Sequence, residues 1–183
     1  AALSAGFDDA SLLRADAFGL PGDRMLLILV RRYLPRQKIP SMKGIGRISS
    51  YYPVSHATGR RVSALTDTLR LQGYHPLPAP PGISLKTAAR LAGLGMPGRH
   101  TLLMHPRFGS FCHLRALLMD RPQDPPPVIS APADHSIDGE APLHPRCRHC
   151  RRCLDACPTG AIREDGTLDR SLCLRQVMSG HLP

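Results

Sequence analysis

The residues best suited to chemistry are four closely spaced cysteines followed by a proline. Cys147, Cys150, Cys153 and Cys157 precede Pro158 in the pattern C-x2-C-x2-C-x3-C-P, which bacterial ferredoxins use to hold iron-sulfur clusters. Thiolates separated by two residues can surround one corner of a cubane, and the fixed φ of the proline turns the chain after the fourth. The spacing therefore predicts 4Fe-4S ligation and electron transfer.

Zinc is the alternative occupant of such a run. Structural zinc sites also use C-x2-C pairs, but about 12 to 20 residues normally separate the two pairs. Here Cys153 follows Cys150 by only three positions, so the spacing favours iron and sulfide. Cys112 lies in an apolar run, and we expect it to be a buried packing residue rather than a ligand.

Length and composition predict a globular protein. The chain has 183 residues, of which 42% are hydrophobic, enough for one sizeable core and a small appendage. No apolar run approaches the length of a membrane span, and residues 1–10 lack the pattern of a signal peptide. We therefore expect a cytoplasmic, reducing location with no membrane partner, which suits thiolate ligands better than disulfides. Because the chain opens without Met and ends soon after Cys173, we also expect it to be a piece of a longer protein.

The chain is strongly basic. Lys and Arg number 24 against 14 Asp and Glu, giving a net charge of +10, which would attract a polyanion such as RNA. A solvated basic surface is the alternative, and base stacking is poorly supported because aromatic residues make up only 4%. Four arginines interleave with the cysteines and would offset the negative charge of a cluster: Arg146, Arg148, Arg151 and Arg152.

Hydrophobic patterns predict the elements around this module. Met25 to Val30 is an unbroken apolar run typical of a buried central strand. Apolar residues at helical spacing predict a helix over about 59–71, with Gly73 as its stop. A second helix is predicted from Ser84, as N-cap, to Gly93.

The order of elements predicts an α+β, α/β-like protein of two domains. Thr101 to Met104 and Phe111 to Met119 are predicted strands of one sheet. A Pro-rich linker is expected at 121–143, between an α/β domain at 1–120 and a cluster-binding domain at 144–183. We find no internal repeat.

Gly93, Gly95 and Gly98 match the letters of G-x-G-x-x-G. A dinucleotide fingerprint needs a strand before it and a helix after it. Here a predicted helix precedes the glycines and an apparent strand follows, so the sequence argues against NAD binding. The glycines instead indicate a tight turn with close backbone approach, open to another ligand.

Several segments carry a family resemblance. Lys86 to Leu103 contains Ala-Gly-Leu-Gly and is followed by Pro106 to Gly109; Asp155 to Ile162 and Leu168 to Cys173 complete the pattern. In this order they resemble the epoxyqueuosine reductase family and the shorter dicluster iron-sulfur proteins related to it and to reductive dehalogenases. The resemblance covers about residues 24–183.

The resemblance implies a fold, cofactors and partners. It implies a nitroreductase-like domain that binds cobalamin, contacts of Gly93, Gly95 and Gly98 with the corrinoid, and one or two 4Fe-4S clusters that reduce its cobalt. The best-known member reduces the epoxide of a queuosine precursor in tRNA, with electrons from a donor such as ferredoxin or flavodoxin. By the family pattern, one cluster is held by Cys147, Cys150 and Cys153, and a second receives Cys157 and Cys173. Two clusters need eight ligands, and the chain has six cysteines, so we expect at most one labile cluster on this chain alone.

The chain also departs from the family pattern. Met96 and Arg99 replace a Trp and a Lys, and Ala79 stands where the tRNA-acting enzymes carry a proton-donating Asp. No carboxylate lies between Asp67 and Asp120, although epoxide opening needs a positioned acid. Two alternatives to a corrinoid-dependent reductase stay open. The missing acid favours an electron-transfer or activator protein without substrate chemistry of its own, and the charge alone suggests a zinc-stabilised RNA-binding module. No catalytic residue is assigned.

Overall fold

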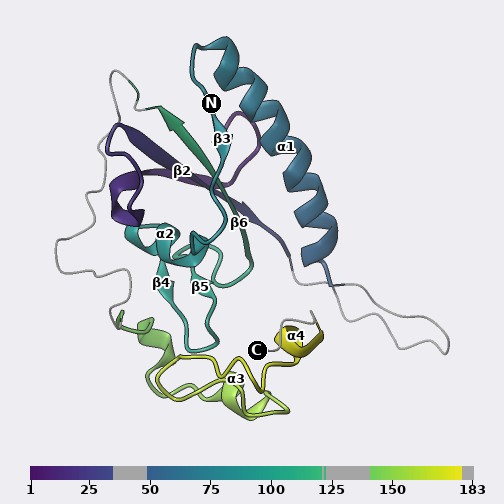
Figure 1. Ribbon diagram of the computed structural model, residues 1–183. Coiled ribbons are helices and arrows are strands. Elements are labelled where there is room, and N and C mark those ends of the chain that lie inside the picture. The colour runs from purple at the N-terminus through teal and green to yellow at the C-terminus, as the bar shows by residue number, and fades with distance from the viewer. Residues whose placement is uncertain (35–48, 121, 123–140, 179–183) are drawn as a thin grey trace, which may run out of the picture. The chain divides into compact units, whose positions relative to one another are not determined.

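The structure is a computed structural model that describes residues 1–34, 49–120, 122 and 141–178 (Figure 1). Its contacts divide the chain into two compact units, Ala1–Leu94 with Phe111–Ile137 and Gly95–Ser110 with Asp138–Pro183. We call these the sheet unit and the cysteine unit. The contacts thus group Gly95–Ser110 with the cysteines, where the sequence suggested a single domain over 1–120. The predicted domain boundaries stay a prediction.

The sheet unit is built on four antiparallel strands in the order β1-β2-β6-β3. The predicted strand at Met25 to Val30 is confirmed as the middle of β2, which lies between two neighbours and is buried along most of its length. A short 3-10 helix, η1, connects β1 to β2. The bounds are β1 Asp9–Arg14, η1 Ala15–Phe18, β2 Arg24–Arg32, β3 Leu77–Pro78 and β6 Cys112–Asp120.

One cluster of the apolar core lies between this sheet and the helix α1 (Tyr51–Leu71). Side chains alternate across a strand, so Met25 and Leu29 of β2 share one face. They pack in one cluster with Leu65 and Leu69, one helical turn apart on α1. Burying each leucine contributes about 1.5–3 kcal/mol, so this contact holds α1 on the sheet.

The helix α1 begins earlier than the sequence indicated. It starts at Tyr51 rather than near residue 59. Pro53 does not prevent this earlier start, because a proline is tolerated in a first turn, where the N–H groups lack helical partners. Its predicted stop is confirmed, since Gly73 adopts a left-handed φ of 85°. Tyr51 packs edge-on against Tyr33, with ring centroids 6.0 Å apart.

The second helix, α2 (Leu85–Leu91), follows the prediction closely. The hydroxyl oxygen of Ser84 accepts the backbone N–H of Thr87 at 3.3 Å, which confirms Ser84 as the N-cap. The helix packs against β1, β2 and β6. Gly93 ends it with a φ of 73°.

The prediction that Thr101–Met104 and Phe111–Met119 share one sheet is wrong. β5 (Leu103–Met104) pairs with β4 (Met96–Pro97) in a separate two-stranded hairpin, whereas β6 pairs with β2 and β3. The reason is the turn between β4 and β5, where the N–H of Gly98 donates to the carbonyl of Leu102 at 2.9 Å and folds the segment back on itself.

Most of the predicted linker, 121–143, lies outside the described residues; residues 122 and 141–143 form no helix or strand. Over the residues that the structure describes, no helix has the length and apolarity needed to cross a bilayer.

Candidate iron-sulfur site

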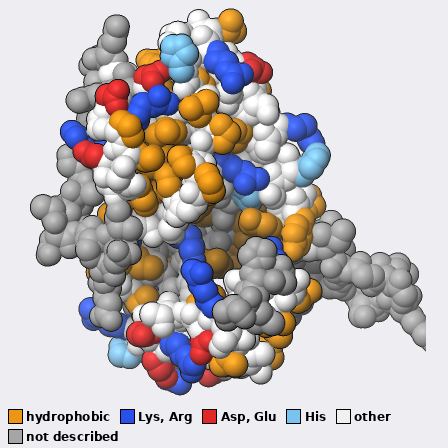
Figure 2. All heavy atoms as spheres, in the orientation of Figure 1, with side chains coloured by type: hydrophobic (Ala, Val, Ile, Leu, Met, Phe, Trp, Pro, Cys, Tyr) orange, Lys and Arg blue, Asp and Glu red, His pale blue; other side chains and the backbone are white. Residues whose placement is uncertain are grey.

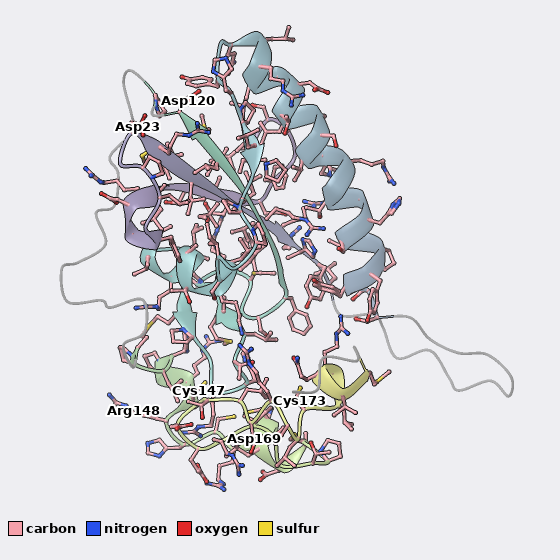
Figure 3. The ribbon with its side chains drawn as sticks, viewed as in Figure 1. Asp23, Asp120, Cys147, Arg148, Asp169 and Cys173 are labelled. Carbon is pink, nitrogen blue, oxygen red and sulfur yellow. The ribbon has the colours of Figure 1, made fainter. Side chains whose placement is uncertain are left out.

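All five predicted ligands belong to the cysteine unit. Cys147 ends the 3-10 helix η2 (Pro145–Cys147), Cys153 lies in α3 (Arg152–Asp155), and Cys173 directly precedes α4 (Leu174–Met178). Cys150 is exposed, whereas the other four are half-buried. Figure 3 shows Cys147 and Cys173 in the same small module, which also contains Asp169.

The first cysteine is positioned by a capped turn. The ring Nδ1 of His144 accepts the backbone N–H of Arg146 at 3.2 Å, and the carbonyl of His144 accepts the N–H of Cys147 at 2.8 Å. The N–H of His144 in turn donates to the carbonyl of Pro97 at 2.8 Å. These bonds attach the start of the cysteine run to the β4–β5 hairpin of the same unit.

Backbone amides surround the fourth cysteine. After Pro158 the chain curls so that the N–H groups of Ile162 and Thr159 donate to the Cys157 sulfur and lower its pKa to about 7. The hydroxyl of Thr159 lies 3.8 Å from the same sulfur. N–H groups directed at a sulfur favour the thiolate, the form that ligates iron.

A short loop behind Cys157 is held by one carboxylate. The backbone N–H of Asp169 donates to the carbonyl of Ala161 at 2.7 Å and closes the loop. Its side chain accepts the hydroxyl of Ser171 at 2.6 Å and pairs with Arg163 at 2.5 Å, interactions that lower the pKa of this carboxyl group. Asp169 therefore stabilises the loop behind Cys157.

Arg99, in the β4–β5 turn, also contacts the cysteine run. Its backbone N–H donates to the Cys147 sulfur at 3.4 Å, and its guanidinium donates to the carbonyls of Cys150 and Glu164 at 2.5 and 2.9 Å. From the sequence, Arg99 was identified only as a departure from the family pattern, and its contacts with the cysteine run were not predicted. These partners lie 48, 51 and 65 positions away in the chain, beyond the reach of local patterns.

The donor set fits an iron-sulfur cluster by its chemistry. Within the described ranges, no three Cys, His, Asp or Glu side chains gather where they could hold one metal ion. A cubane places each thiolate on a different iron, and amide donors to the cysteine sulfurs are a feature of such sites. Such donors are present at Cys147 and Cys157.

Cys112 differs from these cysteines. It begins β6 in the sheet unit and is half-buried. Burial raises the pKa of its thiol to about 11, which disfavours the thiolate form needed by a ligand. This environment supports its interpretation as a packing residue.

The three candidate corrinoid glycines have conformational or packing reasons to be glycine. Gly93 terminates α2 at positive φ. A Cβ on Gly95 would lie 2.5 Å from the carbonyl oxygen of Met104, and one on Gly98 would lie 2.5 Å from the ring of His100. They match the expected tight turn after a helix. Their contact with a corrinoid stays a prediction.

The charges of the cysteine unit are of both signs. Figure 2 shows basic, acidic and His side chains mixed on the visible face of the region where Figure 1 labels α3. Arg151 pairs with Glu164, and Arg163 pairs with Asp169. Part of the positive charge expected around the cluster is therefore compensated by carboxylates.

Comparisons with known proteins agree with this site. Residues 146–181, which contain all five candidate ligands, match the model of the 4Fe-4S double cluster binding domain. The epoxyqueuosine reductase of Aliivibrio fischeri is 34% identical over 114 residues, which cover 61% of this chain and 27% of that protein. The one from Escherichia coli is 27% identical over 178 residues, covering 90% of this chain and 43% of that protein.

Solved structures show the same fold. The epoxyqueuosine reductase of Streptococcus thermophilus superposes with a TM-score of 0.61 at 21% identity, covering 94% of this chain and 54% of that one. A crystal structure of epoxyqueuosine reductase with an epoxyqueuosine-modified tRNA stem loop also gives 0.61, at 20% identity, covering 94% and 53%. The chain thus spans about half the length of these structures and less of the two relatives above. Sequence, fold and cluster domain agree in supporting the resemblance of this chain to the epoxyqueuosine reductase-like family of dicluster 4Fe-4S proteins.

Proposed function

We propose that this chain provides the electron-transfer part of a reductase of the epoxyqueuosine reductase type. Cys147, Cys150 and Cys153 ligate one 4Fe-4S cluster, and Cys157 and Cys173 serve the same or a second cluster. The observation that carries this proposal is the capped cysteine run with amide donors at the sulfurs of Cys147 and Cys157, inside the segment that matches the double-cluster domain. An external ferredoxin or flavodoxin would supply the electrons.

The proposal assigns a corrinoid to the α/β part of the chain. Support comes from the fold shared with epoxyqueuosine reductases and from the tight backbone at Gly93, Gly95 and Gly98. When bound, a corrinoid would supply a reducible cobalt centre for reductive chemistry. The contribution of this chain is to bind it and to hold the clusters that deliver electrons.

We infer that tRNA is the substrate class. One solved relative contains an epoxyqueuosine-modified tRNA stem loop, and the net charge of +10 favours a polyanionic partner. Electrostatic attraction of this kind supplies affinity without sequence specificity.

A second candidate is an electron-transfer or activator protein without substrate chemistry. It is favoured because Ala79 stands at the position where the family pattern has a proton-donating Asp. Ala79 follows β3 and is held by a backbone bond from its N–H to the carbonyl of Ala116 at 3.2 Å. Its methyl side chain cannot donate a proton to an opening epoxide.

Anaerobic reconstitution of the 183-residue chain with iron and sulfide, followed by cobalamin, separates these functions. A reductase predicts visible and EPR signals of a 4Fe-4S cluster, a spectral shift on adding cobalamin, and retention of cobalamin on a desalting column. The activator predicts the cluster signals alone. Zinc retention without a cluster signal would contradict both and favour a zinc-stabilised RNA-binding module.

A further inference from the structure

Arg99 is the residue of the β4–β5 hairpin with direct contacts to the cysteine run. The turn that carries it is closed by the bonds from the Gly98 N–H to the Leu102 carbonyl and from the Thr101 N–H to the Gly98 carbonyl, at 2.9 and 2.8 Å. This closure fixes the backbone N–H of Arg99 toward the Cys147 sulfur. Because the turn is already closed, the backbone of Arg99 loses little conformational freedom when a cluster forms at Cys147.

The guanidinium of Arg99 ties together two loops of the unit. One nitrogen donates to the carbonyl of Cys150, inside the cysteine run, and Nε donates to the carbonyl of Glu164, in the loop behind Cys157. A planar guanidinium holds two acceptors in a fixed fork, which a lysine ammonium cannot reproduce. The two loops are thereby kept at a set separation within the cysteine unit.

The charge of Arg99 also differs from that of its neighbours. Within the described part of the chain, its hydrogen-bond partners are two carbonyl oxygens and a thiol sulfur, with no carboxylate among them. Arg151, by contrast, pairs with Glu164. Among the residues that the structure describes, the guanidinium of Arg99 thus has no carboxylate hydrogen-bonded to it.

We propose that Arg99 is a positioning residue that sets both the lifetime and the reduction potential of the cluster held by Cys147 and Cys150. This inference rests on the proposed ligation of a cluster by these cysteines. An N–H at a ligand sulfur and a nearby positive charge both stabilise the reduced, more negative cluster and raise its potential. The guanidinium fork adds the anchoring that slows loss of the cluster.

Two substitutions separate the charge from the fork. Arg99→Gln removes the charge and the fork but keeps the backbone N–H, so we expect a lower potential and faster cluster release. Arg99→Lys keeps the charge, so the potential should change little, while loss of the fork speeds release to a chelator about tenfold. For Arg99→Gln we expect the ratio of reduced to oxidised cluster at a fixed solution potential to fall about tenfold. This corresponds to a reduction potential lower by about 59 mV for a one-electron couple.

Arg148→Gln is the matched control. Arg148 lies in the same cysteine run but is exposed, and its side chain points away from the module in Figure 3. Like the other arginines of the run it was expected to offset the charge of a cluster, but solvent screens the charge of this exposed side chain, so its loss should matter less than that of Arg99. Spectroelectrochemical titration and chelator-release kinetics of the reconstituted chains should therefore show a much larger effect at Arg99. Equal shifts in Arg99→Gln and Arg148→Gln would overturn the proposal.

Hydrogen exchange on the full chain without iron tests the anchoring separately. Arg99→Gln should raise exchange in residues 96–104 and 147–150, while Arg148→Gln should not. Unchanged exchange would contradict the anchoring role even if clusters assemble. If the unaltered chain takes up no cluster but this exchange difference is found, the proposed function fails and the anchoring by Arg99 stands.

Discussion

The sheet unit and the cysteine unit are stabilised by different means. The first buries a large set of apolar side chains between β2, β6 and α1. In the second, the buried hydrophobic residues among those described are Leu103 and Ala161. Its contacts are instead backbone turns, ion pairs and the bonds of Arg99.

This difference indicates where the cofactor matters for folding. A module with so little apolar core normally needs metal ligation for stability, and metal-binding free energy then becomes folding free energy. The sheet unit needs no such aid, because its hydrophobic cluster is continuous. Predictions that affect one unit and spare the other test this contrast.

The largest expected effect follows from loss of a cluster ligand. Cys150→Ala should abolish the visible chromophore and leave the cysteine unit rapidly exchanging, while amides of β2 and β6 stay protected. Absorbance after reconstitution and hydrogen exchange measure the two outcomes. Cys112→Ala is the control, because Cys112 lies in the other unit and its thiol pKa is raised by burial. Equal loss of chromophore in both variants would refute its assignment as a packing residue.

The converse experiment weakens only the sheet unit. Leu29→Ala removes a fully buried side chain from the core cluster and should cost about 2–5 kcal/mol of unfolding free energy. Leu71→Ala, at a side chain that is 90% exposed, should change it by less than about 0.5 kcal/mol. Urea denaturation followed by circular dichroism gives both values. Loss of the chromophore in parallel with the Leu29 transition would show that the two units do not fold separately.

Local signals in the sequence predicted the local structure. The apolar run at Met25 to Val30 and the hydroxyl of Ser84 act over a few residues, and both elements are confirmed. The start of α1 was missed because its buried apolar residues, Leu65 and Leu69, lie in the second half of the helix. The pairing of β5 with β4 depended on turn closure, which hydrophobicity does not encode.

The candidate site also contains features that the sequence predicted and features that it did not. Cysteine spacing identified the candidate ligands because a cluster imposes short, fixed intervals. The contacts of Arg99 could not be read from the sequence, since they join segments that become neighbours only in the folded unit. The burial of His113 was missed for a similar reason. It lies on β6 with its ring 5.0 Å from that of Tyr51 and is only 2% exposed.

His113 gives the sheet unit a pH dependence. Burial, with a smaller contribution from Arg115, lowers its pKa to about 4. In the unfolded chain, with a pKa of about 6.5, His113 binds protons that the folded state rejects. Stability is therefore full above pH of about 6.5 and falls as the pH drops toward about 4, by about 3 kcal/mol.

The carboxyl groups with lowered pKa act in a different window. Those of Asp120 and Asp169 lose stabilisation only as the pH falls below their ordinary value of about 4. Denaturation of His113→Gln across pH of about 4.5 to 7 should therefore show a flatter stability profile than the unaltered chain. An unchanged slope would show that His113 is accessible to protons in the folded state.

The smallest effect concerns the N-cap of α2. Ser84→Ala removes the acceptor of the Thr87 N–H and should lower the stability of the sheet unit by about 1 kcal/mol. Ser63→Ala is a matched control, because Ser63 is exposed within α1 and its hydroxyl donates to the carbonyl of Gly59 at 3.4 Å. Alanine has the higher helix propensity there, so that variant should be neutral or slightly more stable. Since α2 packs on three strands of the sheet, the Ser84 loss should appear in the unfolding transition of the sheet unit and leave the chromophore unchanged. Equal effects of the two substitutions would mean that the cap bond contributes nothing beyond the propensity of the residue.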